Sequence, residues 1–174
     1  YGPWYMQHKA SEEILEKQRK HKWLQPPLIS IAVPAYHTPE VFLRQLLEAL
    51  IGQTYPNWEL CMANASPEDQ KMAAVLKEYS EMDERIRFQN LEKNLGIAEN
   101  TNAAFAMARG SFIGLLDHDD LLAPDALYEI ALRIQEEKAD FIYTDEDKVT
   151  EDLSEHYQPH LKPDFNLDLL RSNN

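Results

Sequence analysis

Residues 28–51 read LISIAVPAYHTPEVFLRQLLEALI, an apolar run rich in β-branched residues followed by a segment with helical spacing. The run from Leu28 to Val33 predicts a buried strand, because short uninterrupted apolar segments are typical of strands covered on both faces. Between Pro39 and Ile51 the apolar residues recur every three or four positions, which predicts an amphipathic helix. This strand–helix unit sets the pattern for the chain that follows.

The same alternation continues as far as residue 143. The predicted strands are 58–63, 85–89, 111–116 and 140–143, and the predicted helices between them are 67–79, 97–108 and 124–136. Beyond Thr144 the pattern fades into polar loop, until Pro163 begins a last short predicted helix. Strands that alternate with helices predict an α/β fold with a mainly parallel sheet and helices on both faces.

The chain before this alternation has a different character. Residues 1–25 are polar with scattered aromatics, and Ser11 is placed to begin a helix that runs to about Lys22. We therefore predict a helical lead-in over 1–25, with a membrane-surface role as the alternative, and a nucleotide-binding domain over 26–174. Because the chain starts at Tyr1 and not at Met, we expect it to be part of a longer protein, with the domain truncated at its carboxyl end.

Composition excludes several classes of function. The 174 residues carry a net charge of −13, which argues against nucleic acid as a partner, because phosphate binding needs a basic surface. The single cysteine, Cys61, allows no internal disulfide and favours a reducing compartment. No apolar stretch approaches the roughly 20 residues needed to span a bilayer, so no membrane span is predicted in this chain.

Three carboxylates follow the fourth predicted strand in the sequence LLDHDD, residues 115–120. Carboxylates this close repel one another, and a divalent cation removes the cost of ionising all of them. In an extended segment Asp117 and Asp119 point to the same side and can reach one hard ion, such as Mg²⁺ shared with a substrate phosphate. The alternative is a solvated acidic turn that leads into the next helix.

Polar residues also follow the other strands, at the edge where open parallel sheets bind their ligands. They occur in PAYH (34–37), in NAS (64–66) and in the stretch from Asn90 to NLG (94–96). Taken singly, each of these segments favours a structural role as a turn or a helix cap. A dinucleotide enzyme is disfavoured, because neither G-x-G-x-x-G nor a phosphate loop follows any strand.

The order of these segments resembles family 2 of the inverting glycosyltransferases, which have the GT-A fold, a Rossmann-like architecture. The resemblance covers roughly residues 27 to 170 and is closest to enzymes that build bacterial surface polysaccharides. It rests on the motifs SIAVPAY (30–36), YPNWEL (55–60), NLGI (94–97), LDHDD (116–120), LLAPDAL (121–127) and YTDEDK (143–148).

The resemblance implies roles for individual residues. Pro34 and Tyr36 match the turn that holds the nucleotide base, and Asn64 stands where the family usually has an aspartate that contacts the base. An amide offers donors as well as an acceptor, so this departure puts the usual uridine contact in doubt. The segment beside the base and ribose is matched by Asn94, Gly96 and Asn100.

Asp117 and Asp119 match the family's DxD motif. Asp119 would bind the Mn²⁺ or Mg²⁺ on the donor diphosphate, while Asp117 would contact the ribose or help to hold the metal; Asp120 is an alternative for either. The implied reaction is metal-dependent transfer of a sugar from a nucleoside diphosphate, a UDP-sugar by preference, to a saccharide or lipid-linked acceptor. The supply of nucleotide sugars adds to the reduced cysteine in favouring the cytoplasm or the inner face of the membrane.

The general base of this reaction is expected beyond residue 174. The acidic residues 145–147 are interpreted as a polar turn, and His156 and His160 as loop residues, in preference to catalytic or metal-binding roles. Two further hypotheses stay open: a non-catalytic nucleotide-binding or scaffolding module, and a cation site with a purely structural role.

Overall fold

A computed structural model describes residues 1–172. The chain divides into two compact units: a larger one from Ala10 to Ala139, and a smaller one that combines Tyr1–Lys9 with the chain from Asp140 onward. The predicted domains, 1–25 and 26–174, stay a prediction. Within residues 1–172, no helix has the length and the apolar character needed to cross a bilayer.

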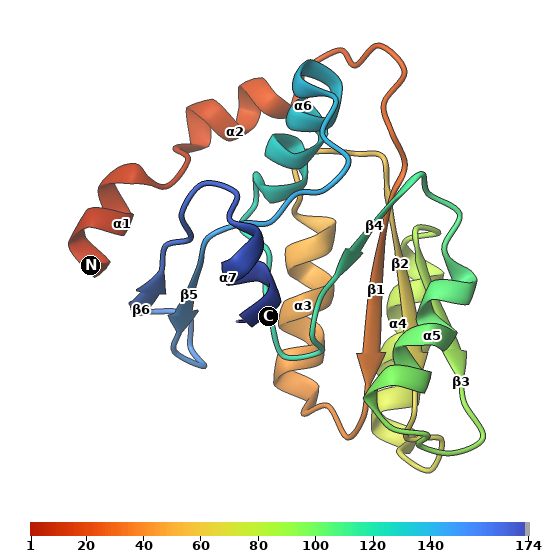
Figure 1. The fold of residues 1–174 in the computed structure, drawn as a ribbon. Helices are drawn as coiled ribbons and strands as arrows, with labels where there is room; N and C mark the ends of the chain where they lie inside the picture. The colour runs from red at the N-terminus through yellow and green to blue at the C-terminus, as the bar shows by residue number, and fades with distance from the viewer. Residues whose placement is uncertain (173–174) are drawn as a thin grey trace. The chain divides into compact units, whose positions relative to one another are not determined.

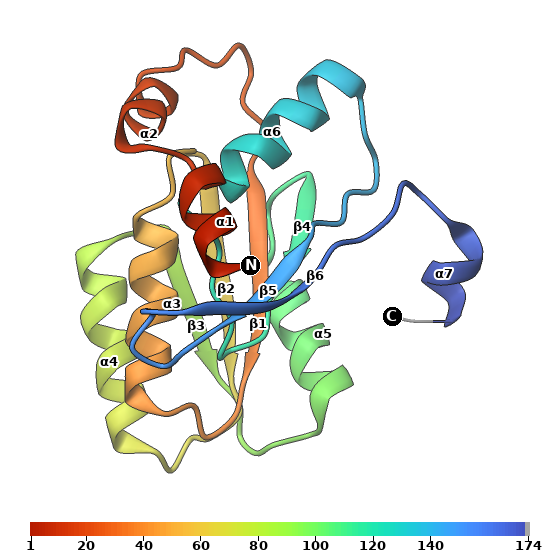
Figure 2. The same cartoon turned by 90° about the vertical axis from the view of Figure 1, so that its left-hand side faces the viewer.

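The larger unit contains a four-stranded parallel sheet with the strand order β3-β2-β1-β4. Helices cover both faces of this sheet, with α3 and α4 on one side and α5 on the other (Figures 1 and 2). The predicted α/β class is thereby confirmed. The strands are β1 (Ile29–Ala35), β2 (Trp58–Asn64), β3 (Ile86–Asn90) and β4 (Phe112–Leu115); the helices are α2 (Glu12–Arg19), α3 (Glu40–Ile51), α4 (Gln70–Met82), α5 (Ile97–Met107) and α6 (Ala126–Glu137).

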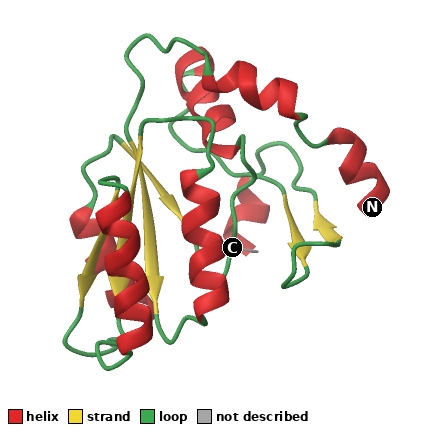
Figure 3. Ribbon diagram, turned by 180° about the vertical axis from the view of Figure 1, so that it is seen from behind, coloured by secondary structure: helices red, strands yellow, loops and turns green. Residues whose placement is uncertain are grey.

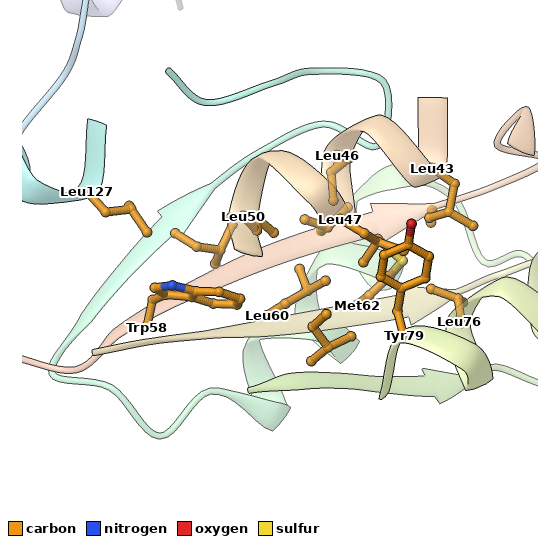
Figure 4. Close-up of a cluster of buried hydrophobic side chains, with 14 of the residues drawn as sticks. Leu43, Leu46, Leu47, Leu50, Trp58, Leu60, Met62, Leu76, Tyr79 and Leu127 are labelled. Carbon is orange, nitrogen blue, oxygen red and sulfur yellow. The ribbon is translucent and has the colours of Figure 1, made fainter. Parts of the chain in front are cut away.

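Large side chains fill the face of the sheet that α3 covers (Figure 4). Alternate residues of each strand point to this face, so Ile31 of β1 and Leu60 of β2 lie in the same apolar layer. From α3, residues at helical spacing enter it and are fully buried: Leu43, Leu46, Leu47 and Leu50. Burial of such side chains stabilises the fold by about 1.5–3 kcal/mol each.

Small side chains line the opposite face, which packs against α5. Ala32 of β1, Ala63 of β2 and Ala104 of α5 belong to one buried cluster. Cys61 points to the same side of β2 as Ala63 and is fully buried. Burial, together with the nearby charge of Glu59, raises the pKa of the Cys61 thiol to about 11.

A buried carboxylate connects three strands on this small-residue face. Glu59 of β2 accepts a hydrogen bond from Ser30 Oγ of β1 at 2.7 Å and lies 2.9 Å from Arg87 Nη1 of β3. Arg109, in the turn before β4, adds a main-chain bond of 2.7 Å and a guanidinium contact of 2.7 Å. Burial raises the pKa of Glu59, but the hydrogen bonds from Ser30, Arg109 and Arg87 outweigh it and lower the pKa to about 2.

The smaller unit contains the short helices α1 (Gly2–His8) and α7 (Leu167–Ser172) and an antiparallel pair, β5 (Glu146–Val149) with β6 (His156–His160). The two strands of this pair are drawn in yellow in Figure 3. Tyr5 of α1 stacks on His156 of β6 with ring centroids 3.8 Å apart.

The predicted fifth strand at 140–143 is wrong. This segment is irregular, and its aromatic residues Phe141 and Tyr143 are exposed, with the hydroxyl of Tyr143 donating to Pro163 O at 2.7 Å. A short apolar run has no strand character without a partner for its backbone. The prediction of a polar loop beyond Thr144 is also wrong. Here polar residues do find a backbone partner, and their main-chain pairing forms strands.

Two boundaries differ from the predicted ones for local reasons. Helix α4 begins at Gln70 and not at Pro67, because the side chain of Asp69 caps it by accepting from Lys71 N and Met72 N. Strand β1 runs through Pro34 to Ala35, past the predicted end at Val33.

Candidate functional site

The residues singled out in the sequence lie near the carboxyl ends of four strands that all run in the same direction, or in the loops and helix that follow them. These ends therefore meet at one edge of the sheet in the larger unit, which is the edge where open α/β sheets bind ligands. The residues of this edge are Pro34, Tyr36, Asn64, Asn90, Asn94, Gly96, Asn100, Asp117 and Asp119.

Pro34 lies inside β1, opposite Ala63 of β2, and is buried. It is tolerated in a central strand because the ladder between β1 and β4 ends at Ala32, the residue whose carbonyl accepts from Leu116 N at 3.3 Å. Pro34 points its nitrogen toward the β4 side beyond that ladder, so its missing N–H leaves no unpaired partner. The chain turns at Tyr36, directly after Ala35, which is the last residue of β1.

Tyr36 and His37 form the turn after β1. The Tyr36 side chain is 45% exposed, and its ring centroid lies 4.2 Å from that of His37. His37 has a φ of 48°, in the left-handed region that non-glycine residues rarely adopt. Its Nε2 lies 3.4 Å from Glu68 Oε1. A half-exposed aromatic ring at this edge is suited to stack on a planar group such as a nucleotide base.

Asn64, the last residue of β2, is at the centre of a hydrogen-bonded row. Its Oδ1 accepts from Ser66 N at 2.9 Å, and its Nδ2 donates to Asn90 Oδ1 of β3 at 2.9 Å. Ser66 Oγ in turn accepts from His37 N at 2.7 Å. The row thus joins the ends of β3, β2 and β1 through side chains.

The loop before α5 is held by two asparagines. Asn94 Oδ1 accepts from Gly96 N and from Asn100 Nδ2, each at 2.9 Å, and Asn100 Oδ1 accepts from Leu95 N at 3.2 Å. Gly96 has φ 90° and ψ 166°, a conformation open almost only to glycine. The exposed fraction of Asn100 is 3%, so its amide fixes the loop from inside.

Residues 117–120 form a hydrogen-bonded turn in which Asp120 N donates to Asp117 O at 3.2 Å. The extended conformation that we expected for Asp117 and Asp119 is therefore wrong, although both carboxylates are exposed at this edge. The turn forms because no strand pairs with β4 beyond the Ala32–Leu115 position within the described sheet. Both carboxylates therefore project from a single tight turn.

Carboxylate oxygens are the ligands that Mg²⁺ and Mn²⁺ prefer, so the chemistry of this turn fits a hard cation. Among residues 1–172, no group of three or more His, Cys, Asp or Glu side chains is arranged to hold a metal ion. A site that takes one or two protein carboxylates and completes its coordination with phosphate oxygens needs no such group. The residues therefore fit a cation that arrives with a diphosphate.

Two buried polar atoms at this edge have no hydrogen-bond partner within the described part of the chain. They are Thr38 Oγ1, after β1, and His118 Nδ1, between the two aspartates. An unpaired buried polar atom costs about 1–3 kcal/mol, so such atoms are rare unless a ligand or water completes them. Four further polar residues of this edge were not predicted from the sequence as site residues: His37, Thr38, Ser66 and His118. The signal that could have identified them is their position just after the end of a strand.

The carboxylates and histidines of the smaller unit bond to one another. His156 Nδ1 lies 2.9 Å from Asp147 Oδ2, and His160 Nδ1 lies 2.9 Å from Glu146 Oε1. Asp145 Oδ1 accepts from Lys162 N at 2.7 Å. These contacts connect β5, β6 and the chain that follows, as expected of side chains that stabilise a small hairpin.

Comparison with known proteins assigns the fold and the family. The family model described as glycosyl transferase family 2 matches residues 30–172. A solved structure of S. aureus TarS 1-349 in complex with UDP superimposes with a TM-score of 0.58 and 28% identity, over 64% of this chain and 33% of that one.

Two curated relatives extend the comparison. An uncharacterized protein, y4gI, of Sinorhizobium fredii is 43% identical over 83% of the chain, and the O-antigen biosynthesis protein RfbC of Myxococcus xanthus is 33% identical over 99%. The chain spans only 16% and 14% of the length of these two relatives.

Proposed function

Because this chain belongs to glycosyl transferase family 2, we propose that it holds the donor site of an inverting glycosyltransferase that builds surface polysaccharide. The donor would be a nucleoside-diphosphate sugar, with a UDP-sugar as our first choice, and the acceptor a saccharide or lipid-linked saccharide. The RfbC relative supports the polysaccharide assignment, and the UDP complex of TarS supports the choice of nucleotide.

One observation carries the proposal: an exposed aromatic turn, a hydrogen-bonded pair of amides and an exposed acidic turn all lie at the carboxyl ends of parallel strands. In this arrangement Tyr36 would stack on the base, and the loop at Asn94 and Gly96, held by Asn100, would border the base and ribose. Pro34 would shape the entry to the turn, and Asp117 would contact the ribose or the metal.

Asp119 and Asp117 would hold Mn²⁺ or Mg²⁺ together with the diphosphate. When bound, such a cation neutralises the charge that develops on the leaving diphosphate. The residues of this chain would bind and orient the donor, while Thr38 Oγ1 and His118 Nδ1 offer it two buried polar atoms that no described residue pairs with.

In the reaction, the bond from the sugar anomeric carbon to the diphosphate oxygen breaks, and a bond to the acceptor oxygen forms on the opposite face. The acceptor hydroxyl loses its proton to a general base, and the nucleoside diphosphate departs with the electron pair. We assign that base to a part of the longer protein outside this chain and assign no catalytic residue within residues 1–172.

The proposal is tested by calorimetric titration of UDP into the protein with Mn²⁺, and again with EDTA. We expect binding that requires the metal and that falls at least tenfold in Asp119→Ala. Glu136→Ala is the matched control, because it removes one exposed carboxylate from α6, away from this edge. GDP and dTDP as comparators measure the preference for the base.

Two results would overturn the donor-site proposal. Cation binding that is indifferent to nucleotide would favour a structural cation site. Failure of every nucleotide to bind would favour a scaffolding module with the same fold. Nucleotide binding without sugar transfer by the longer protein would support the non-catalytic binding module.

A further inference from the structure

Asn64 has no surface that a ligand reaches. Its exposed fraction is 0%, and it lies between Ala35 of β1 and Asn90 of β3 in the sheet register. The donor on Ser66 is a main-chain N–H, so the atom of Asn64 that accepts from it must be Oδ1. The amide nitrogen is then the group that donates to Asn90, and both ends of the side chain are engaged within the protein.

The bonds of Asn64 continue to the exposed turn. Ser66 is also fully buried, and its hydroxyl oxygen accepts from His37 N at 2.7 Å. A main-chain bond from Ala65 N to Ala35 O at 2.8 Å runs beside this contact. Asn64 therefore fixes the position of Ser66, and Ser66 fixes the backbone of His37.

The turn at His37 needs such support. A non-glycine residue at φ 48° costs on the order of 1–2 kcal/mol, and it persists only where surrounding contacts hold it. The residue directly before it is Tyr36, the exposed ring of this edge. A change in the backbone at His37 therefore moves the ring of Tyr36.

We propose that Asn64 is a positioning residue, which sets the Tyr36–His37 turn for the nucleotide through Ser66 and does not itself read the base. This inference rests on the proposed donor site. It predicts that substitutions at residue 64 weaken the binding of all nucleotides alike and leave the ratios between the UDP, GDP and dTDP affinities unchanged.

The first test needs no nucleotide. Hydrogen exchange of the His37 amide, measured by NMR, is expected to accelerate at least tenfold in Asn64→Ala and in Ser66→Ala, because each removes one link of the row. Thr54→Val is the matched control. It removes a buried hydroxyl from the same unit, but that hydroxyl donates to Gln18 Oε1 at 2.8 Å and precedes the amino end of β2, away from this edge. Unchanged His37 exchange in Asn64→Ala would overturn the proposal.

The second test is the affinity for UDP, GDP and dTDP in the same variants. We expect about a tenfold loss of affinity for each nucleotide in Asn64→Ala and Ser66→Ala, and no loss in Thr54→Val. The double variant is expected to lose no more affinity than the single variant with the larger loss, because the two side chains act in series. Asn64→Asp should rescue binding, since a carboxylate accepts from Ser66 N and Asn90 can present its amide nitrogen to it.

The outcomes separate this inference from the donor-site proposal. A change of tenfold or more in the UDP to GDP ratio, seen in Asn64→Ala or Asn64→Asp and absent in Ser66→Ala, would show that residue 64 reads the base and would overturn the inference. If the wild-type protein binds no nucleotide, the donor-site proposal fails, and His37 exchange still decides whether Asn64 positions the turn.

Discussion

Arg109 contacts the carboxylate of Glu59 through three nitrogen atoms: its main-chain N at 2.7 Å, Nε at 2.9 Å and Nη2 at 2.7 Å. Arg109 lies in the turn between α5 and β4, whereas Glu59 lies in β2. The contact therefore fixes where the chain returns from α5 to the sheet. Because β4 leads directly into the acidic turn, the position of the candidate metal ligands Asp117 and Asp119 depends on this contact.

Glu59→Gln is expected to lower the free energy of unfolding by about 3 kcal/mol, because it leaves Arg87 and Arg109 without their buried counter-charge. Denaturant unfolding measures this loss. Glu137→Gln, which breaks the exposed pair with Arg133 on α6, is the control and should change stability by less than about 1 kcal/mol. Equal effects of the two substitutions would contradict the role assigned to Glu59.

The pKa of Glu59 predicts how stability depends on pH. Its folded-state pKa, about 2, is below the ordinary value of 4.5, so the unfolded chain takes up the proton first as the pH falls. The contribution of Glu59 is complete above pH 4.5 and is lost as the pH falls through this window toward 2. The stability difference between wild type and Glu59→Gln should be about 2 kcal/mol smaller at pH 3 than at pH 7. A difference independent of pH would contradict the assignment.

Gly110→Ala is expected to destabilise the larger unit by about 2 kcal/mol. A Cβ at this position would lie 2.5 Å from Leu28 O and 2.7 Å from Ser30 Oγ, so the backbone must move. Thermal unfolding checks the prediction. Gly2→Ala serves as control, since its Cβ would meet its nearest atom at an ordinary 3.4 Å. An unchanged unfolding temperature in Gly110→Ala would contradict the prediction and would mean that the backbone of the turn before β4 moves at little cost.

Asn100→Ala is expected to lower the free energy of unfolding by about 1–3 kcal/mol, because it leaves Leu95 N without a partner and removes one of the two donors to Asn94 Oδ1. The loss should appear as faster hydrogen exchange of the Leu95 amide. Asn102→Ala, on the exposed side of the same helix, is the control and should change stability by less than about 0.5 kcal/mol. Identical Leu95 exchange in the two variants would contradict a structural role for Asn100.

The parallel sheet was predictable because its signal is local. The apolar runs that became β1 and β2 are bounded by proline and polar residues, and both strands are buried on two faces. The strand predicted at 140–143 was wrong because a four-residue apolar run carries no information about its partner. The hairpin formed by β5 and β6 was missed because main-chain pairing of polar residues leaves no periodic apolar signal.

The candidate site was predictable residue by residue but not as a network. Sequence and family resemblance pointed to Asn64, yet only the structure shows that its amide bonds to Asn90 and Ser66. The reason is physical: the partner of a buried amide depends on neighbouring strands whose register is not encoded near it. The extended geometry expected for Asp117 and Asp119 was wrong for a related reason, because the end of the β4 ladder sets where the turn begins.

Because Cys61 is buried, the rate at which a thiol reagent modifies it reports how the larger unit opens. The chain has one cysteine, so every modification by a thiol reagent reports on this position. With no exposed surface and a pKa raised to about 11, the thiol reacts at neutral pH only when the small-residue face opens, through displacement of α5 or unfolding of the unit. The labelling rate therefore reports the opening of that face, and a nucleotide bound beside the Asn94–Asn100 loop should slow it.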